Sequence, residues 1–168
     1  MKNLLIMALC LFTLTAQAGT LESRLETFFT GLEGQWKKIS ADSYRETPAG
    51  EFNHSVGTHF SANVKRAGQL WKFAEEACWA EEGEDEACGE SFVTYEIQGE
   101  NLFAILDGEK YPVDVLELED GYIMMMLVTK DFAFTAILTV DDSGLSQESV
   151  FEMPDGVKEY QFLKLGKQ

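Results

Sequence analysis

The stretch YIMMMLVTKDFAFTAILTVDDSGLSQESVF, residues 122–151, decides the fold of this chain. It holds three runs rich in β-branched and aromatic residues, 122–129, 132–140 and 145–151, which are separated by short polar turns. In the second run Phe134 and Leu138 fall on one face of a strand and Thr135 falls on the other, because side chains alternate along a strand. Strands joined by tight turns predict antiparallel hairpins.

The same pattern continues outward from this stretch, from Gly34 to the C-terminus. Further β-rich runs lie at 35–40, 52–65, 70–77, 91–97, 102–106, 113–118 and 157–165, and turn signals such as Asp107-Gly108 separate them. Nine or ten strands at this spacing are typical of an all-β sandwich or barrel. No helical crossover fits between these runs, which excludes a parallel sheet.

A closed barrel is favoured over a sandwich. An open sheet of ten neighbouring strands would leave two unpaired edges, whereas closure pairs them. Short consecutive turns favour an up-and-down order over a Greek key, which needs a long return connection. The sequence therefore predicts an all-β fold, a closed antiparallel up-and-down β-barrel of eight to ten strands with a short N-terminal capping helix.

The helix is predicted from an apolar stripe near the start of the β-rich region. Leu25, Phe29 and Leu32 recur at helical spacing, with Leu21 and Phe28 on the same face. Two N-caps compete, Ser23 with Glu26 as its capping-box partner and Thr20. The stripe must be buried against another part of the molecule.

Residues 1–18 have the three parts of a cleavable secretory signal. Lys2 supplies the positive charge, residues 4–14 are apolar except for Thr13, and Ala16-Gln17-Ala18 offers small residues at the cleavage site. The apolar run is too short to span a membrane, which takes about 20 residues. We therefore expect an exported protein, periplasmic or secreted, with a mature domain of residues 19–168.

The chain is strongly acidic. Its formal charge is −16, and loss of Lys2 with the signal leaves 12 basic against 29 acidic residues, or −17. Such a field repels phosphate backbones and anionic lipid, so nucleic acid is not an expected ligand. Solubility is the simpler explanation of the acidity, and attraction of a cationic ligand or basic partner is the alternative. No later stretch is apolar enough for a membrane-spanning helix.

Cys78 and Cys88 remain once the signal, with Cys10, is removed. Two cysteines in an oxidising compartment predict one disulfide. A redox pair would more often be Cys-x-x-Cys, and a zinc site would need further cysteine or histidine ligands.

The segment Gly34-Gln35-Trp36 follows the predicted helix and opens the first strand. This Gly-x-Trp motif resembles that of the lipocalins and the wider calycin group, including bacterial lipocalin-like domains. The resemblance implies that the glycine lets the chain enter a barrel and that Trp36 packs across the end closed by the helix. Lipocalins place an arginine of a late strand over this tryptophan. Arg66 is the last arginine here, which leaves Lys158 or Lys164 for that role.

No motif of catalysis is present: no Gly-x-Ser-x-Gly, no His-Glu-x-x-His and no phosphate-binding loop. We therefore expect no enzyme activity, metal or cofactor. His54 and His59 are five residues apart on one predicted strand, so they should face opposite sides unless a bulge intervenes. The acidic run 81–86 could gather calcium, although a solvated loop is more common.

The segment Tyr122–Val128 is apolar on both faces, which favours a strand covered on both sides over a surface for a subunit or partner. A barrel of this size either encloses one small ligand or is filled by side chains. Our leading hypothesis is a barrel that carries a small apolar or amphipathic ligand. Candidate interior residues are Trp36, Phe60, Trp71, Phe73, Phe92, Phe134, Leu138, Tyr160 and Phe162. The alternative is a filled barrel that binds a basic exported protein, for example as an inhibitor of a lysozyme-like enzyme.

Overall fold

A computed structural model describes residues 19–81 and 85–168. The predicted signal peptide, residues 1–18, and part of the acidic run, residues 82–84, lie outside the described residues. The elements are α1 (Leu21–Leu32), β1 (Gly34–Glu46), β2 (Phe52–Ala67), β3 (Leu70–Glu81), β4 (Ala87–Gln98), β5 (Asn101–Leu106), β6 (Glu109–Glu119), β7 (Tyr122–Val128), β8 (Ala133–Asp141), β9 (Gly144–Glu152) and β10 (Lys158–Lys167). None of the described helices is long and apolar enough to cross a membrane.

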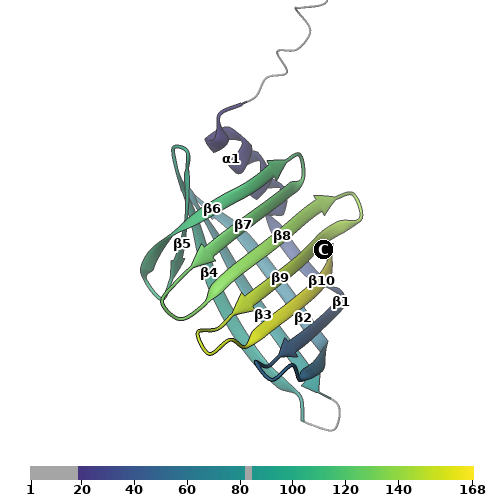
Figure 1. Ribbon diagram of the computed structural model, residues 1–168. Helices are drawn as coiled ribbons and strands as arrows, with labels where there is room; N and C mark the ends of the chain where they lie inside the picture. Colours follow the sequence, from purple (N-terminus) through teal and green to yellow (C-terminus); the bar gives the residue numbers. More distant parts are fainter. Residues whose placement is uncertain (1–18, 82–84) are drawn as a thin grey trace, which may run out of the picture.

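The ten strands form one closed antiparallel barrel in up-and-down order (Figure 1). Each strand pairs with the next one along the chain, and β1 pairs with β10 to close the ring. The predicted fold class is confirmed. β1 is longer than predicted, because a register shift between Lys38 and Ser40 lets pairing with β10 continue to Glu46. The inward residues beyond that shift, Ala41 and Ser43, are too small to give a clear apolar alternation.

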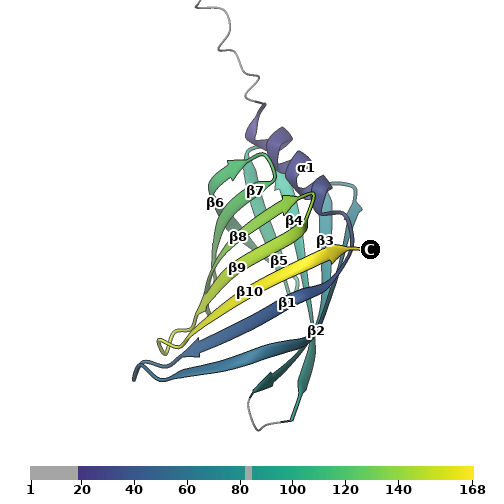
Figure 2. The ribbon, with the colours of Figure 1, turned by 90° about the vertical axis from the view of Figure 1, so that its right-hand side faces the viewer.

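Helix α1 lies across one end of the barrel, which we call the capped end (Figure 2). Thr20 is its N-cap, since the Thr20 side chain accepts a hydrogen bond from the Ser23 amide at 3.2 Å. The buried face of the helix carries the predicted stripe, Leu25, Phe28, Phe29 and Leu32. The opposite end, where the β1–β2 and β9–β10 hairpins turn, is the far end (Figure 2).

Four aromatic side chains, Phe29, Trp71, Phe73 and Tyr95, form an aromatic plug beneath the helix. The Phe29 ring is central: its centroid lies 5.6 Å from that of Trp71, 6.1 Å from that of Phe73 and 5.3 Å from that of Tyr95. Because β3 and β4 supply the other three rings, one helical residue joins the cap to the barrel wall.

Trp36 is 2% exposed, and its indole Nε1 donates a hydrogen bond to the Leu32 carbonyl oxygen at 2.8 Å. The Lys167 Nζ lies 5.3 Å from the Trp36 ring centroid. Gly34 has φ +132°, and a Cβ at this position would come within 2.9 Å of Lys167 Cε. The lysine over the tryptophan is therefore Lys167. Lys158 and Lys164 were the wrong candidates, because β10 continues two residues past Leu165, where its predicted run ended.

Both histidines face outward, contrary to the expectation of opposite faces. A β-bulge between Gly57 and His59 adds one residue to β2 and restores the outward direction at His59. The two side chains still share no site: His54 Nε2 lies 3.1 Å from Asp42, and His59 Nε2 lies 3.8 Å from Glu76.

The predicted disulfide is present. Cys78 of β3 and Cys88 of β4 are directly opposite in the strand pairing and are bonded to each other. The bond staples the β3–β4 hairpin at the far end of the barrel. Both thiols are used in this bond, so the grouping of Cys78, Cys88 and Glu86 is not a metal site.

Strand β7 was expected to be covered on both sides, and this expectation was wrong. Ile123, Met125 and Leu127 face the interior and are buried. Met124 and Met126 face outward and are half-buried. Helix α1 does not cover them, because it packs over the end of the barrel and not over its outer wall. The apolar outer face of β7 therefore has no covering layer in the described part of the chain.

Candidate ligand cavity

The barrel interior holds a cavity of about 200 Å³, which is partly open to solvent. The cavity begins beneath Leu32, at the end of α1, and reaches Phe132 and Phe151 near the far end. Its volume is below the roughly 300–1,000 Å³ of common ligand sites, yet far above the space of one water molecule. The interior is thus neither a large pocket nor packed solid.

Small inward-facing side chains leave this space. Met125, Ala136 and Ser149 are cross-strand neighbours on β7, β8 and β9, so two of three adjacent inward positions carry small residues. Ala62 of β2 lines the same cavity from the other side. The capped end is filled by the aromatic plug, and the middle of the barrel is left partly empty.

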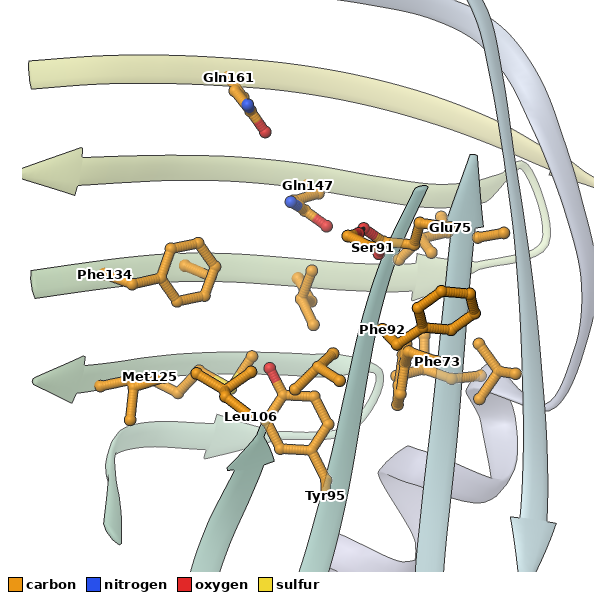
Figure 3. Close-up of a pocket in the computed structure, with 18 of the residues that line it drawn as sticks. Phe73, Glu75, Ser91, Phe92, Tyr95, Leu106, Met125, Phe134, Gln147 and Gln161 are labelled. Carbon is orange, nitrogen blue, oxygen red and sulfur yellow. Dashed lines mark hydrogen bonds between the residues drawn. The ribbon is translucent and has the colours of Figure 1, made fainter. Parts of the chain in front are cut away.

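The cavity wall is mainly apolar, with aliphatic and aromatic side chains from β2–β5 and β7–β10. Phe134 and Phe151 pack together in this wall, with ring centroids 4.5 Å apart. Four uncharged or acidic polar side chains interrupt it: Glu75, Ser91, Gln147 and Gln161. Figure 3 shows these four along one side of the cavity, with Leu106, Met125 and Tyr95 on the other.

Glu75 and Ser91 are a directly opposed pair on β3 and β4. The Ser91 hydroxyl donates a hydrogen bond to Glu75 Oε2 at 3.0 Å. Burial raises the pKa of the Glu75 carboxyl above its usual range, and the Ser91 hydrogen bond offsets part of that rise. Glu75 is half-buried, so a carboxylate at this position costs more to ionise than one at the surface.

Tyr95 connects the aromatic plug with this acidic position. Its hydroxyl points into the cavity (Figure 3). Burial first, and then the negative charge of Glu75, raise the pKa of Tyr95, so the phenol stays protonated. A neutral phenol can donate a hydrogen bond to a ligand or accept one from it.

The two glutamines are oriented by neighbours on their own strands. Gln147 Nε2 donates to Ser149 Oγ at 3.3 Å, and Gln161 Nε2 donates to Glu159 Oε1 at 2.8 Å. Each amide NH₂ group therefore uses one of its two hydrogens. The carbonyl oxygens are the amide groups best placed to serve as acceptors for a ligand.

Six of the nine predicted interior residues face inward, and these are Trp36, Phe60, Trp71, Phe73, Phe134 and Leu138. Phe73, Phe134 and Leu138 line the cavity itself, and so does Phe92, although its side chain is mostly exposed. Trp36, Phe60 and Trp71 are packed in the core and do not border the cavity.

The other three predicted interior residues, Phe92, Tyr160 and Phe162, are on the outer face. Phe92 is 67% exposed and still borders the cavity, and its neighbours Ser91 and Val93 are paired with the inward residues Glu75 and Phe73. Tyr160 and Phe162 alternate with Gln161 and Leu163, and the latter pair faces inward. Alternation showed two faces on each strand but could not identify the inner one.

The sequence reasoning missed the polar side of the cavity: Glu75, Ser91, Gln147 and Gln161. A signal was present at Glu75, which follows Trp71 and Phe73 at strand spacing and so shares their face. A charged residue on an otherwise aromatic face is the kind of exception that marks a site. Among known proteins, no protein-family model matches this chain, and no curated protein matches it.

Proposed function

We propose that this protein is an exported barrel that binds a small, mostly apolar molecule in its interior and is not an enzyme. The observation that carries the proposal is the partly empty cavity of about 200 Å³ with an apolar wall and one polar side. Apolar contact would supply most of the affinity, at about 25 cal/mol per Å² removed from water. The polar side chains would fix the orientation of the ligand.

Two further features support this proposal. The helix-capped barrel with Trp36 at its closed end agrees with the lipocalin-like resemblance, whose members carry ligands in such interiors. The Cys78–Cys88 disulfide fits an oxidising compartment, as does the predicted signal peptide. Periplasmic or secreted localisation is part of the proposal.

The test is a titration with benzene and n-hexanol, two neutral probes that suit a small cavity. Two-dimensional NMR would follow the methyl signals of Met125 and Leu127, which line the cavity. The proposal predicts saturable shifts of these signals. Ala136→Phe, which puts a ring into the cavity, should abolish them. The matched control is Thr135→Phe, which puts the same ring on the outer face of the same strand.

Absence of saturable binding of either probe to the folded wild-type protein would overturn the proposal. Equal binding by the two variants would overturn the location of the site. Circular dichroism of each variant establishes that the barrel is intact before the titrations are compared.

A second candidate function is suggested by the outer wall. Tyr44 stacks on His54 with ring centroids 4.7 Å apart, and Phe162 meets the Tyr44 ring edge-on at 6.1 Å. This outer aromatic cluster (Tyr44, His54 and Phe162) would contact a basic exported protein, which the charge of −17 would attract. A basic lysozyme is a suitable probe. Binding that disappears above about 0.5 M salt and in Phe162→Ser would favour this function; binding to neither form would exclude that partner class.

A further inference from the structure

Glu75 is an acid without a basic partner. No lysine, arginine or histidine of the described residues lies within 4.0 Å of its carboxylate. Its one side-chain hydrogen bond, from Ser91, reaches Oε2 and leaves Oε1 available. An uncompensated acid beside an apolar cavity lowers stability, so it is an unusual choice for a position that serves packing alone.

The groups around Glu75 are acceptors or neutral. The paired residues on β2 and β4 are Ala62 and Ser91, and Tyr95 is the only other titratable side chain among the described residues that line the cavity. Glu159, which accepts hydrogen bonds from Gln161 and Ser43, adds a second acid toward the far end. The polar side of the cavity therefore offers negative charge and oxygen acceptors, and no positive charge.

This arrangement matches a protonated amine. An ammonium group has several N–H donors and no acceptor, so it complements a carboxylate flanked by amide and phenol oxygens. The apolar wall would receive the carbon body of such a ligand, and the rings of Phe73 and Phe134 would add a favourable surface for a cation. The overall charge of −17 also attracts cations and repels fatty acids and other anions.

We infer that the cavity selects small amphipathic amines, with Glu75 as the residue that binds the ammonium group. This inference rests on the proposed function, because it requires that the cavity bind a ligand. It goes beyond that function because it names the chemical class of the ligand, amines, and the residue that distinguishes amines from other ligands, Glu75.

The experiment compares three probes with the same six-carbon chain: n-hexylamine, n-hexanol and n-hexanoate. Isothermal titration calorimetry at pH 7.5 would measure the dissociation constant of each. We expect n-hexylamine to bind about tenfold more tightly than n-hexanol, the difference typical of a charge-assisted hydrogen bond. n-Hexanoate should bind most weakly of the three.

The discriminating variant is Glu75→Gln, which keeps the shape of the side chain and removes its charge. It should remove the tenfold preference for the amine, so that n-hexylamine and n-hexanol bind to the variant with similar dissociation constants. Glu90→Gln is the matched control, since it removes the same charge from an exposed position next to Ser91. The control should bind both probes as the wild type does.

A second measurement needs no variant. Ammonium binding requires ionised Glu75, so the affinity of the wild type for n-hexylamine should rise as pH rises from 4 through the raised pKa of that carboxyl. Tyr95 stays neutral across this range, because burial raises its pKa above the already high value of a free phenol. n-Hexylamine itself stays protonated, as amines of this kind do below about pH 10. The affinity for n-hexanol should not change.

The outcomes separate the inference from the proposed function. If n-hexanol binds as tightly as n-hexylamine, or if Glu75→Gln binds n-hexylamine as the wild type does, the amine inference is overturned and the carrier function stands. If none of the three probes binds to the wild type, both are overturned. A flat pH profile for n-hexylamine contradicts the role of Glu75 whether or not the variant folds.

Discussion

The two ends of the barrel interior are built on different principles. At the capped end Phe29 fills the space between Trp71, Phe73 and Tyr95, and all four side chains are buried. Midway along the barrel, inward positions carry small or polar residues, and a cavity of about 200 Å³ remains. The first region gains stability from close packing, whereas the second gives up packing and so gains the space and polar groups that a ligand needs.

This difference shows how one closed sheet can hold both a stable core and an interior cavity. Closure gives every strand two neighbours, so the backbone hydrogen bonds do not depend on how the interior is filled. The aromatic plug can then carry much of the side-chain packing, and the disulfide holds the hairpin at the far end.

Phe29→Ala should be the most destabilising single substitution at the capped end. Phe29 is 0% exposed, and its removal leaves three aromatic rings around an empty space. We expect a loss of about 3–5 kcal/mol in the free energy of unfolding, measured by urea denaturation. Phe134→Ala, at the half-buried cavity wall, is the control and should cost about 2 kcal/mol or less, because its ring already borders a cavity. Equal losses would contradict the division between the two regions.

Loss of the disulfide should weaken the far end. The Cys78→Ala/Cys88→Ala double variant opens a short loop, and the chain-entropy model assigns such a loop about 2–3 kcal/mol. Denaturation with and without reductant would measure this, and reductant should have no effect on the double variant. Near-ultraviolet circular dichroism of the aromatic plug should stay unchanged in the folded state. A change in that signal would show that the two ends are coupled.

Thr20→Ala tests how much the N-cap contributes to closing the capped end. The substitution removes the hydrogen bond that Thr20 accepts from the Ser23 amide, and we expect a cost of about 1 kcal/mol. Thr27→Ala is the matched control, since Thr27 is an exposed residue within the helix whose hydroxyl bonds only to the Ser23 carbonyl. Thermal unfolding would compare them. A loss for Thr27→Ala as large as that for Thr20→Ala would argue against a capping effect.

The sequence predicted correctly those features that depend on residues close together in the chain. Turn residues such as Asp107-Gly108 and alternation in β8 predicted the hairpins, and short connections predicted their order around a closed barrel. The apolar stripe predicted the helix, and Thr20 was one of its two candidate caps. Each of these depends on residues close together in the chain, where propensity and spacing are informative.

The features missed depend on register and on the summed volume of distant side chains. In β10 Phe162 and Leu163 are adjacent and both apolar, so the sequence does not show which of them faces inward. One bulge at residues 57–59 was enough to reverse the expected direction of His59. Ala62 and Ala136 line the cavity from separate strands, β2 and β8, and no single run of the sequence shows that these small residues border one space.

Glu75→Gln should give the smallest effect, and it is the one that stabilises. Because the pKa of Glu75 is raised in the folded state, the unfolded chain loses its proton first as pH rises above about 4.5. Wild-type stability therefore falls from that pH to the folded pKa and is constant beyond it. Glutamine carries no such penalty, so the advantage of Glu75→Gln over the wild type should grow from pH 4 to pH 8. Partial solvent contact and the Ser91 hydrogen bond limit the size of this advantage.

Urea denaturation across this pH range would measure the advantage of Glu75→Gln, with Glu90→Gln as the control for removal of one charge. An advantage independent of pH would mean that Glu75 ionises as freely as a surface acid, and the contrast between a packed end and an electrostatically costly cavity would then fail.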